Sequence, residues 1–339
     1  MTELRALTSV RGIAAWFVVL YHIRLSIAGL PPGLRDVLAK GYLAVDFFFL
    51  LSGFVIWLTW HERLRARGSV VPFLRKRIAR IWPLHLVILA GAVTLALLLK
   101  ATGRPGSTDY PFAELPLHVL LVQNWGFTDR LTWNDPSWSI SAELGAYLLF
   151  PLLVRAVDWR RVPTPVLLGI AAAILLLLHV AMGAPTLGTG IPRFGLLRCI
   201  AEFATGTIVA ALWLRWRGRG RAPIVAGTGL VLLIAWLLGA PETLVVPAAF
   251  ASLLLVLALT SGAPGNPLEA RWLHYLGEIS YATYLGHFML WVVFKLAFVS
   301  DASAVPAGLI GLYLVLVLGA SIALYHMVER PAQRWINRR

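Results

Sequence analysis

Long apolar segments with few charges recur along the whole chain, and they restrict its fold more than any other feature. A helix needs about 20 residues to cross the hydrocarbon core of a bilayer. Ten segments reach or approach that length, at residues 10–30, 41–60, 82–101, 137–156, 164–183, 195–214, 223–240, 244–262, 276–297 and 307–327. We therefore predict an all-α fold, a polytopic transmembrane helical bundle of about ten spans.

The composition excludes a soluble fold, an internal disulfide and a cysteine-based metal site. Hydrophobic residues make up 59% of the 339 residues, and charged residues only 14%. A soluble protein of this length keeps far more polar surface, so many apolar side chains must face lipid. The apolar segments follow one another without a long polar linker, which predicts a single integral membrane domain over 1–339. The lone Cys199 excludes an internal disulfide and a cysteine-based metal site, and we predict no metal.

The basic residues predict the orientation of the spans. A net charge of +14 on a soluble fold would suggest nucleic acid, but here the basic residues gather in short connections between apolar segments, so no nucleic-acid partner is expected. Most fall on the side of the N-terminus, in connections such as 61–80, 155–161 and 215–221. The positive-inside rule then places both termini in the cytoplasm and the chain in the inner (plasma) membrane, and an even number of spans agrees.

One connection on the opposite side is unusually long, at 102–136. It contains the apolar stretch LPLHVLLVQNWGF, which is too short to cross the bilayer. Non-helical backbone at membrane depth persists only where protein covers it. We therefore predict a short half helix or a re-entrant segment packed against the bundle.

Six ionisable residues fall within or just inside the predicted spans. A charge at the centre of a bilayer costs about 2.5–3.5 kcal/mol on insertion scales, so each of these residues is a functional candidate by default. They are His22, Asp46, Glu143, Arg198, Glu202 and His287.

The first span carries the strongest catalytic candidate. Arg11 and His22 have ten residues between them, so they share one helical face about 16 Å apart. A neutral imidazole can take a proton from a hydroxyl, whereas the simpler interpretation is a structural histidine bonded to a neighbouring helix. Asp46 lies at a comparable depth in the second span. It is expected either to orient His22, as a carboxylate does in a catalytic triad, or to act as an interfacial helix N-cap.

Two arginines precede the third span on one helical face. Paired guanidinium groups such as those of Arg77 and Arg80 suit phosphate recognition. Membrane anchoring is the alternative, and it alone explains most of the basic residues in this connection. In the span before them, Ser52 and Gly53 fit small-residue helix packing.

The sixth and ninth spans contribute further polar side chains. Arg198 and Glu202 are four residues apart and are expected to pair within their helix, which would explain both structurally. Tyr281, Tyr284 and His287 occupy one face of the ninth span. There they either line a polar cavity or pack as amphipathic side chains.

The fourth segment opens with NDPSWSISAELGAYLLFP. Its Trp138 is expected at the outer interface, where tryptophan is common. Glu143 lies about a turn and a half deeper, where packing alone does not account for it. Near the end of the chain, Glu329 looks like the terminus of a helix at the cytoplasmic face, available to pair with the arginine-rich connections.

Seven segments in order resemble the membrane-bound acyltransferase family 3. They are Arg11 and His22 at their spacing, AVDFFFLLSGFVI, RKRIARIWP, QNW, WSISAELGAYLLFP, GEISYATYLGH and the terminal VERP. The spacing of the first pair alone is a weak signal, whereas the ordered set is specific. The resemblance covers essentially the whole chain.

The resemblance implies an enzyme that transfers an acyl group from cytoplasmic acyl-coenzyme A, with no tightly bound cofactor. Acetyl is the first choice of acyl group, and the acceptor would be a hydroxyl of a glycan, a lipid-linked sugar or a small molecule. It implies catalytic roles for His22, Asp46, Glu143 and His287, and contacts to the coenzyme's phosphates by Arg11, Arg77 and Arg80. Trp138, Tyr281, Tyr284 and Arg198 are assigned to the substrate. The hydrolase-like periplasmic domain fused to longer members of this family is not expected here.

Several alternatives stay open at this point. A proton-coupled transporter or flippase could use the same buried histidines and carboxylates as a proton relay. A non-catalytic membrane scaffold is a third class. For an acyltransferase, the sequence leaves open the acyl group, the acceptor and the side on which it binds. It also does not decide whether the acyl group is transferred directly or through an acyl-histidine intermediate, or whether the protein forms a homo-oligomer.

Overall fold

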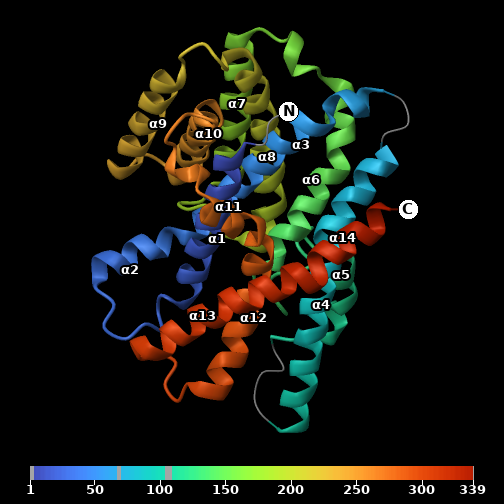
Figure 1. Cartoon of the computed structure of the whole chain (residues 1–339), viewed down its shortest axis with the longest axis vertical. Coiled ribbons are helices and arrows are strands. Elements are labelled where there is room, and N and C mark those ends of the chain that lie inside the picture. Colours follow the sequence, from blue (N-terminus) through green and yellow to red (C-terminus); the bar gives the residue numbers. More distant parts are fainter. Residues whose placement is uncertain (1–3, 67–69, 104–108, 339) are drawn as a thin grey trace.

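The computed structural model describes residues 4–66, 70–103 and 109–338, and every extended regular element within these ranges is a helix (Figure 1). Nine helical segments of the described residues are long and apolar enough to cross a membrane. They are α1 (Arg5–Ile23), Pro32–Arg65, α4 (Val70–Ala101), α6 (Ser137–Ala156), α7 (Thr164–Met182), α8 (Ile191–Trp216), α10 (Glu242–Thr260), α12 (Ser280–Phe298) and Ala307–Asn337. The shorter apolar helix α9 (Ala222–Leu237) occupies the remaining predicted segment. The all-helical fold of about ten spans is therefore confirmed.

Two of the long segments are composite. Pro32–Arg65 contains α2 (Pro32–Ala39), a 3-10 turn η1 (Lys40–Leu43) and α3 (Ala44–Arg65). The last segment contains α13 (Ala307–Leu324), the π-helical turn η5 (Tyr325–Glu329) and α14 (Arg330–Asn337). The remaining short elements are η2 (Phe112–Glu114), α5 (Leu115–Leu120), η3 (Trp159–Arg161), η4 (Pro267–Glu269) and α11 (Arg271–Glu278).

The structure differs from the sequence prediction in one connection and agrees in another. The basic stretch 61–80 is helical over most of its length, because α3 continues to Arg65 and α4 begins at Val70; residues 67–69 lie outside the described part. In the long connection, where 104–108 also lie outside it, α5 is the predicted short half helix. It packs beside α4 (Figure 1), and the side chain of His118 is buried there.

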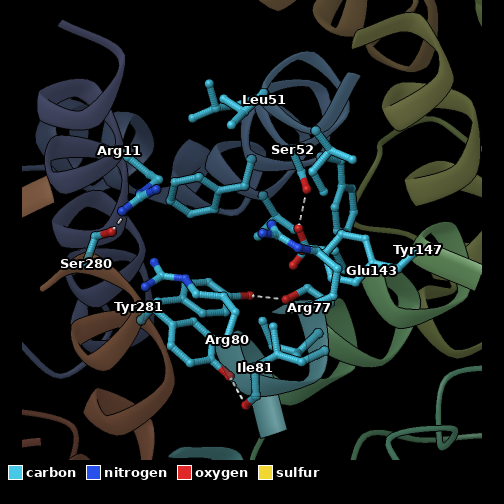
Figure 2. Close-up of a pocket in the computed structure, with 18 residues that line it drawn as sticks. Arg11, Leu51, Ser52, Arg77, Arg80, Ile81, Glu143, Tyr147, Ser280 and Tyr281 are labelled. Atoms are coloured by element: carbon cyan, nitrogen blue, oxygen red, sulfur yellow. Dashed lines mark hydrogen bonds between the residues drawn. The ribbon is translucent and has the colours of Figure 1, made fainter. Parts of the chain in front are cut away.

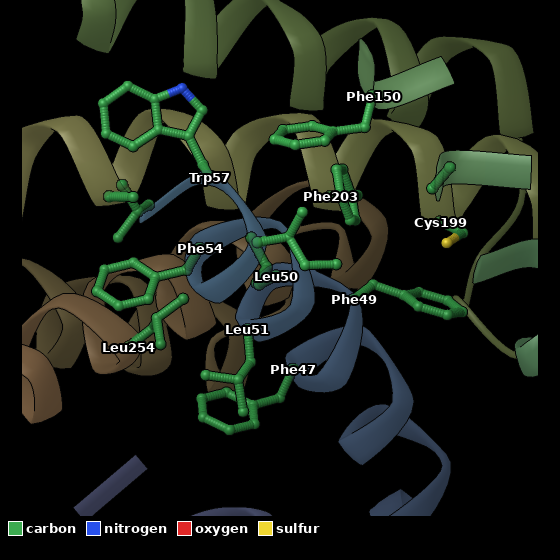
Figure 3. Close-up of a cluster of buried hydrophobic side chains, with 14 of the residues drawn as sticks. Phe47, Phe49, Leu50, Leu51, Phe54, Trp57, Phe150, Cys199, Phe203 and Leu254 are labelled. Carbon is green, nitrogen blue, oxygen red and sulfur yellow. The ribbon is translucent and has the colours of Figure 1, made fainter. Parts of the chain in front are cut away.

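The α3–α8 contact lies at the centre of the bundle. Phe49, Leu50 and Phe54 of α3 are buried among aromatic and aliphatic side chains, Phe203 of α8 among them (Figure 3). The two backbones touch at Gly53 and Gly206. A Cβ at Gly53 would lie 2.0 Å from the carbonyl oxygen of Phe203, and one at Gly206 would lie 2.0 Å from that of Leu50. The predicted small-residue packing at Gly53 is confirmed.

A second close contact joins α1 to α11. A Cβ at Gly277 would lie 1.8 Å from the carbonyl oxygen of Thr8, and one at Gly12 would lie 2.7 Å from the amide nitrogen of Gly277. This approach brings Arg11 of α1 against the junction of α11 and α12. Backbone contact at small residues is a general means of joining helices in membranes, where apolar packing offers no advantage over lipid.

We expect Gly53→Ala to destabilise the bundle, because its methyl group would displace the α8 backbone rather than a flexible side chain. Overpacking of this kind typically costs about 1–3 kcal/mol. The measurement is the thermal unfolding midpoint of the detergent-solubilised protein. Gly91→Ala in α4 is the matched control, since no atom lies within 4 Å of a Cβ at that position. Equal midpoints for the two variants would contradict the close α3–α8 contact.

Candidate functional site

A charged cavity opens among α1, α3, α4, α6 and α12 (Figure 2). Its volume is about 160 Å³, and its wall is largely apolar along α3. The polar lining consists of Arg11, Ser52, Arg77, Arg80, Ser139, Glu143, Tyr147, Ser280, Tyr281 and Tyr284. The structure thus brings together the three arginines that the sequence assigned to phosphate binding. We call this space the arginine cavity.

The three arginines differ in how their charge is compensated. Arg11 donates from Nε to Ser280 Oγ at 3.0 Å and from Nη2 to the carbonyl oxygen of Gly277 at 2.7 Å. Arg80 forms a close ion pair with Glu329, which η5 places in the protein interior. Arg77 forms no ion pair with any described carboxylate, so its guanidinium is the one most available to a ligand in this cavity.

The ion pair of Glu329 confirms that this carboxylate pairs with an arginine of the basic stretch 61–80. Its partner lies on α4 itself, because the helix begins earlier than the sequence suggested. Tyr281 contributes an apolar face to the arginine cavity but not a free hydroxyl. Its hydroxyl donates to the carbonyl oxygen of Ile81 at 2.6 Å. Among the residues described, Tyr281 therefore ties α12 to α4 beside the cavity.

Glu143 belongs to the arginine cavity and not to the surroundings of His22. Its carboxylate accepts a hydrogen bond from Ser52 Oγ at 2.5 Å across the α3–α6 contact. Figure 2 shows Glu143 facing the same space as Arg77 and Tyr147. Ser52 therefore does more than fill a packing position, because it holds a carboxylate at the cavity wall.

A second, smaller cavity of about 50 Å³ lies on the other side of two shared side chains. Val45 and Tyr284 line both this cavity and the arginine cavity. The polar and aromatic lining of the second cavity includes Tyr21, His22, Tyr42, Asp135, Trp138 and Arg198. We call it the histidine cavity. The two cavities therefore meet at Val45 and Tyr284.

The hydrogen bonds of His22 determine which nitrogen carries its proton. His287 Nδ1 faces the carbonyl oxygen of Thr283 at 3.1 Å, so this nitrogen must donate, which leaves His287 Nε2 as an acceptor. His22 Nδ1 lies 3.1 Å from that acceptor and 2.9 Å from the carbonyl oxygen of Val18. With two acceptors opposite it, Nδ1 of neutral His22 carries the hydrogen. His22 Nε2 therefore has a free lone pair.

The nearest carboxylate to this lone pair is Asp135. Its Oδ2 lies 3.6 Å from His22 Nε2, and its side chain is 34% exposed. The distance is too long for a direct hydrogen bond but suits stabilisation of an imidazolium. Sequence reasoning missed Asp135, although it lies in the quoted NDPSW just before α6. A polar residue that immediately precedes a span, next to Pro136, was the available signal.

The prediction that Asp46 orients His22 is wrong. Asp46 Oδ1 accepts two hydrogen bonds from Arg198, from Nη2 at 2.6 Å and from Nε at 3.1 Å, and both side chains are buried. The expected N-cap is also absent, since no side-chain cap hydrogen bond forms at the start of α3. A charged side chain in the apolar interior is stable only when an opposite charge lies beside it. The close contact at Gly53 and Gly206 brings α8, and with it Arg198, against Asp46.

The same ion pair corrects the predicted pairing of Arg198 with Glu202. Arg198 reaches across to α3 rather than along its own helix. Its guanidinium also lies 5.3 Å from the ring centroid of Trp138, within cation–π range. Both of these residues line the histidine cavity, as the sequence assignment to the substrate requires. Asp46 itself lines neither cavity, so it acts on the histidine cavity only through Arg198.

Tyr284 is fixed by two hydrogen bonds to the segment that opens α6. Its hydroxyl lies 2.7 Å from Ser139 Oγ and donates to the carbonyl oxygen of Pro136 at 3.2 Å. Pro136 follows Asp135 directly in the chain. The residue that separates the two cavities therefore also holds the segment that carries the carboxylate beside His22.

The segment before α6 is itself anchored by α5. His85 Nε2 donates to the carbonyl oxygen of His118 in α5 at 2.8 Å. The Nε2 atom of His118 lies 3.0 Å from Thr132 Oγ1, in the segment before α6. Burial, with His85 close by, lowers the pKa of His118 to about 4. His118 is therefore neutral near pH 7, and its hydrogen bonds hold the half helix and the segment around Thr132 together.

Comparisons with known proteins match the whole chain. A family model described as an acyltransferase domain matches residues 4–326. Acyltransferase MdmB of Streptomyces mycarofaciens is 33% identical over 100% of this chain and 94% of its own length. Exopolysaccharide production protein ExoZ of Rhizobium meliloti (strain 1021) is 29% identical over 87% of this chain and 90% of its own. No solved structure matches.

A more distant relative is considerably longer than this chain. O-acetyltransferase OatA of Staphylococcus aureus is 25% identical over 62% of this chain, and the match covers 35% of the relative's length. The likeness to that protein therefore concerns only part of it.

We expect Asp46→Asn to lower mainly the stability of the protein, and Asp135→Asn to lower mainly its activity. Asp46→Asn leaves Arg198 without its counter-charge in the interior, a change that typically costs about 3–5 kcal/mol. Asp135 is partly exposed and forms no close ion pair, so its substitution should leave the thermal unfolding midpoint within a degree or two and lower turnover instead. Midpoints and turnover rates of both purified variants check this. A strongly destabilised Asp135→Asn, or an Asp46→Asn as stable as wild type, would contradict these assignments.

Proposed function

The chain belongs to the membrane-bound acyltransferase family 3, and we propose that it moves an acyl group from cytoplasmic acyl-coenzyme A to a hydroxyl group of an envelope glycan or related acceptor. That it is a multi-pass membrane acyltransferase follows from the family and from the apolar helices. The observation that carries the finer proposal is the contact between the two cavities. A charged space suited to the donor and a space containing a free histidine lone pair meet at Val45 and Tyr284.

The arginine cavity supports acyl-coenzyme A as donor. Arg77 offers a guanidinium without an acidic partner, and Arg11 and Arg80 add positive charge at the same wall. Phosphate oxygens accept hydrogen bonds from such groups with high affinity. The apolar side chains of α3 that line the rest of the cavity suit the largely uncharged pantetheine arm. Under the positive-inside rule this cavity faces the cytoplasm, where coenzyme A is present, and both termini lie on that side.

His22 is proposed as the general base. Its Nε2 takes the proton of the acceptor hydroxyl while the hydroxyl oxygen attacks the thioester carbonyl carbon. The carbon–sulfur bond then breaks, and the coenzyme thiolate receives the proton from the imidazolium. Help of this kind is typically worth about 10²–10⁴-fold in rate. An acyl-His22 intermediate would use the same lone pair as a nucleophile.

The residues around His22 have supporting roles in this proposal. His287 holds His22 in the tautomer whose Nε2 is free, and Asp135 stabilises the imidazolium in place of the expected Asp46. Arg198 and Trp138 are proposed to contact the acceptor from the opposite wall of the histidine cavity. Glu143 is assigned to the donor side, because its carboxylate faces the arginine cavity and is bonded to Ser52.

The class of acceptor is supported by the relatives. One is named for exopolysaccharide production and another as an O-acetyltransferase. The first name fits a glycan as acceptor, and the second fits acetyl as the acyl group and a hydroxyl oxygen as its destination. We propose the inner membrane as the location, since a bilayer next to the cytoplasm supplies the donor on one side and envelope glycans on the other.

We expect His22→Ala to lower the release of free coenzyme A by at least about 100-fold, because the base that activates the hydroxyl is lost. The assay combines protein in nanodiscs with labelled acetyl-coenzyme A and a panel of glycan acceptors. His326→Ala, an exposed histidine in η5, is the matched control and should retain wild-type turnover. Donor binding should persist in His22→Ala. Turnover equal to wild type in that variant would refute the role of His22.

Arg77→Gln should raise the donor KM about tenfold with little change in kcat, because it removes a phosphate ligand that has no ion pair with a described carboxylate and lies 5.9 Å from the ring centroid of Tyr147. Arg80→Gln should raise KM and also lower the unfolding midpoint, since it leaves Glu329 buried without its partner. Adding Glu329→Gln to Arg80→Gln should restore the midpoint while KM stays high. Steady-state kinetics with acetyl-coenzyme A and thermal unfolding separate the two effects. A kcat loss larger than the KM change in Arg77→Gln would contradict the donor assignment.

A further inference from the structure

An open groove continues from the arginine cavity along the cytoplasmic end of α3. Its volume is about 490 Å³, and α3 and the start of α4 form its walls. Its lining is Val55, Leu58, Thr59, Trp60, Arg63, Lys76 and Arg77. Val55 and Arg77 line the arginine cavity as well, so the groove and the cavity are adjoining parts of one surface.

Positive charge dominates this groove. Arg63 and Lys76 come from different helices, and both lie over the indole of Trp60, at 5.6 Å and 5.4 Å from the ring centroid. Trp60 is only 6% exposed and packs edge-on against Phe73, so it is a fixed platform for the two cations. In the part of the chain that the structure describes, Arg63, Lys76 and Arg77 form no ion pair with a carboxylate. The nearby Glu62 is engaged by Arg160 instead, at 2.8 Å.

The groove and the cavity together are long and polarised. Their lining on α3 runs from Val45 to Arg63, about 27 Å at the 1.5 Å rise per residue of an α-helix. The end at Val45 is apolar and meets the histidine cavity, and the end at Arg63 is cationic. A ligand that fits this surface is elongated, anionic at the Arg63 end and again beside the arginines of the cavity, and uncharged where it passes the apolar side chains of α3.

We propose that the groove formed by Trp60, Arg63 and Lys76 binds the 3′-phosphate at the adenosine end of coenzyme A, while Arg77 at the junction contacts the pyrophosphate. This rests on the proposed function, because it assigns a subsite to the same donor. The 3′-phosphate lies with the adenosine at the end of the coenzyme opposite the thioester, and this groove lies at the end of the surface opposite the histidine cavity. A phosphate monoester carries about −1.5 to −2 charge at pH 7, which two unpaired cations on a rigid indole can compensate.

The decisive comparison uses acetyl-coenzyme A and acetyl-dephospho-coenzyme A, which lacks only the 3′-phosphate. Wild type in neutral phosphatidylcholine nanodiscs should have a KM about tenfold higher for the dephospho donor. The double variant Arg63→Gln/Lys76→Gln should raise KM about tenfold for acetyl-coenzyme A and leave that of the dephospho donor unchanged. Wild-type discrimination between the two donors would thereby disappear.

Two further variants sharpen this test. Arg63→Lys/Lys76→Arg retains both charges and should retain most of the discrimination. Arg219→Gln is the matched control, an exposed arginine in the turn between α8 and α9 that lines neither the groove nor either cavity, and should match wild type with both donors. Equal KM values of wild type for the two donors would overturn the proposal, as would an equal rise of both values in the double variant.

An anionic lipid headgroup is the other source of a phosphate at this site. If it is the true ligand, turnover will rise with phosphatidylglycerol content, the double variant will lose that dependence, and the two donors will not be discriminated; that result overturns the proposal. Direct binding of labelled coenzyme A separates this inference from the proposed function. Binding by wild type that is unaffected by the double substitution refutes the subsite alone. No binding by wild type refutes the subsite and the coenzyme A donor together.

Discussion

The ion pair between Asp46 and Arg198 fixes the two helices at the centre of the bundle. Neither charge can stay in the interior without the other, and neither can reach water. The pair forms because Gly53 and Gly206 let the backbones of α3 and α8 come into contact. One face of α3 is thereby committed to α8. Its remaining faces line the arginine cavity, the groove beyond it and, at Val45, the histidine cavity.

The two cavities divide the chemistry between opposite ends of α1. Arg11 faces one of them and His22 the other, which follows from the ten residues between them on a continuous helix. Each is held by α11 or α12: Arg11 through Gly277 and Ser280, and His22 through His287. The helix contact at Gly277 therefore sets the position of α1 against α12. A donor bound at one end and an acceptor at the other would need no large movement of helices to meet.

The sequence predicted the helices that carry most of the site residues but not which neighbours those residues face. Hydropathy and charge predicted the apolar helices and the half helix, and the family resemblance grouped Arg11 with Arg77 and Arg80. The partner predicted for Asp46 was wrong, because hydropathy indicates only how far along a span a residue lies and not which neighbouring helix it faces. Whether Asp46 faces α1 or α8 depends on helix rotation, which the glycine contact determines. Asp135 was missed for a related reason, since it lies outside the spans and only the fold of the preceding connection brings it to His22.

Tyr284 links the separation of the cavities to the alignment of the base. It forms part of the wall between them, and its hydroxyl is bonded to Ser139 and to the carbonyl oxygen of Pro136, next to Asp135. His287 lies one turn further along the same helix and orients His22. A movement of Tyr284 that opened the wall to a thioester would therefore act on the segment that carries Asp135. Under the proposed function, access for the donor and the electrostatic environment of His22 consequently depend on the same side chain.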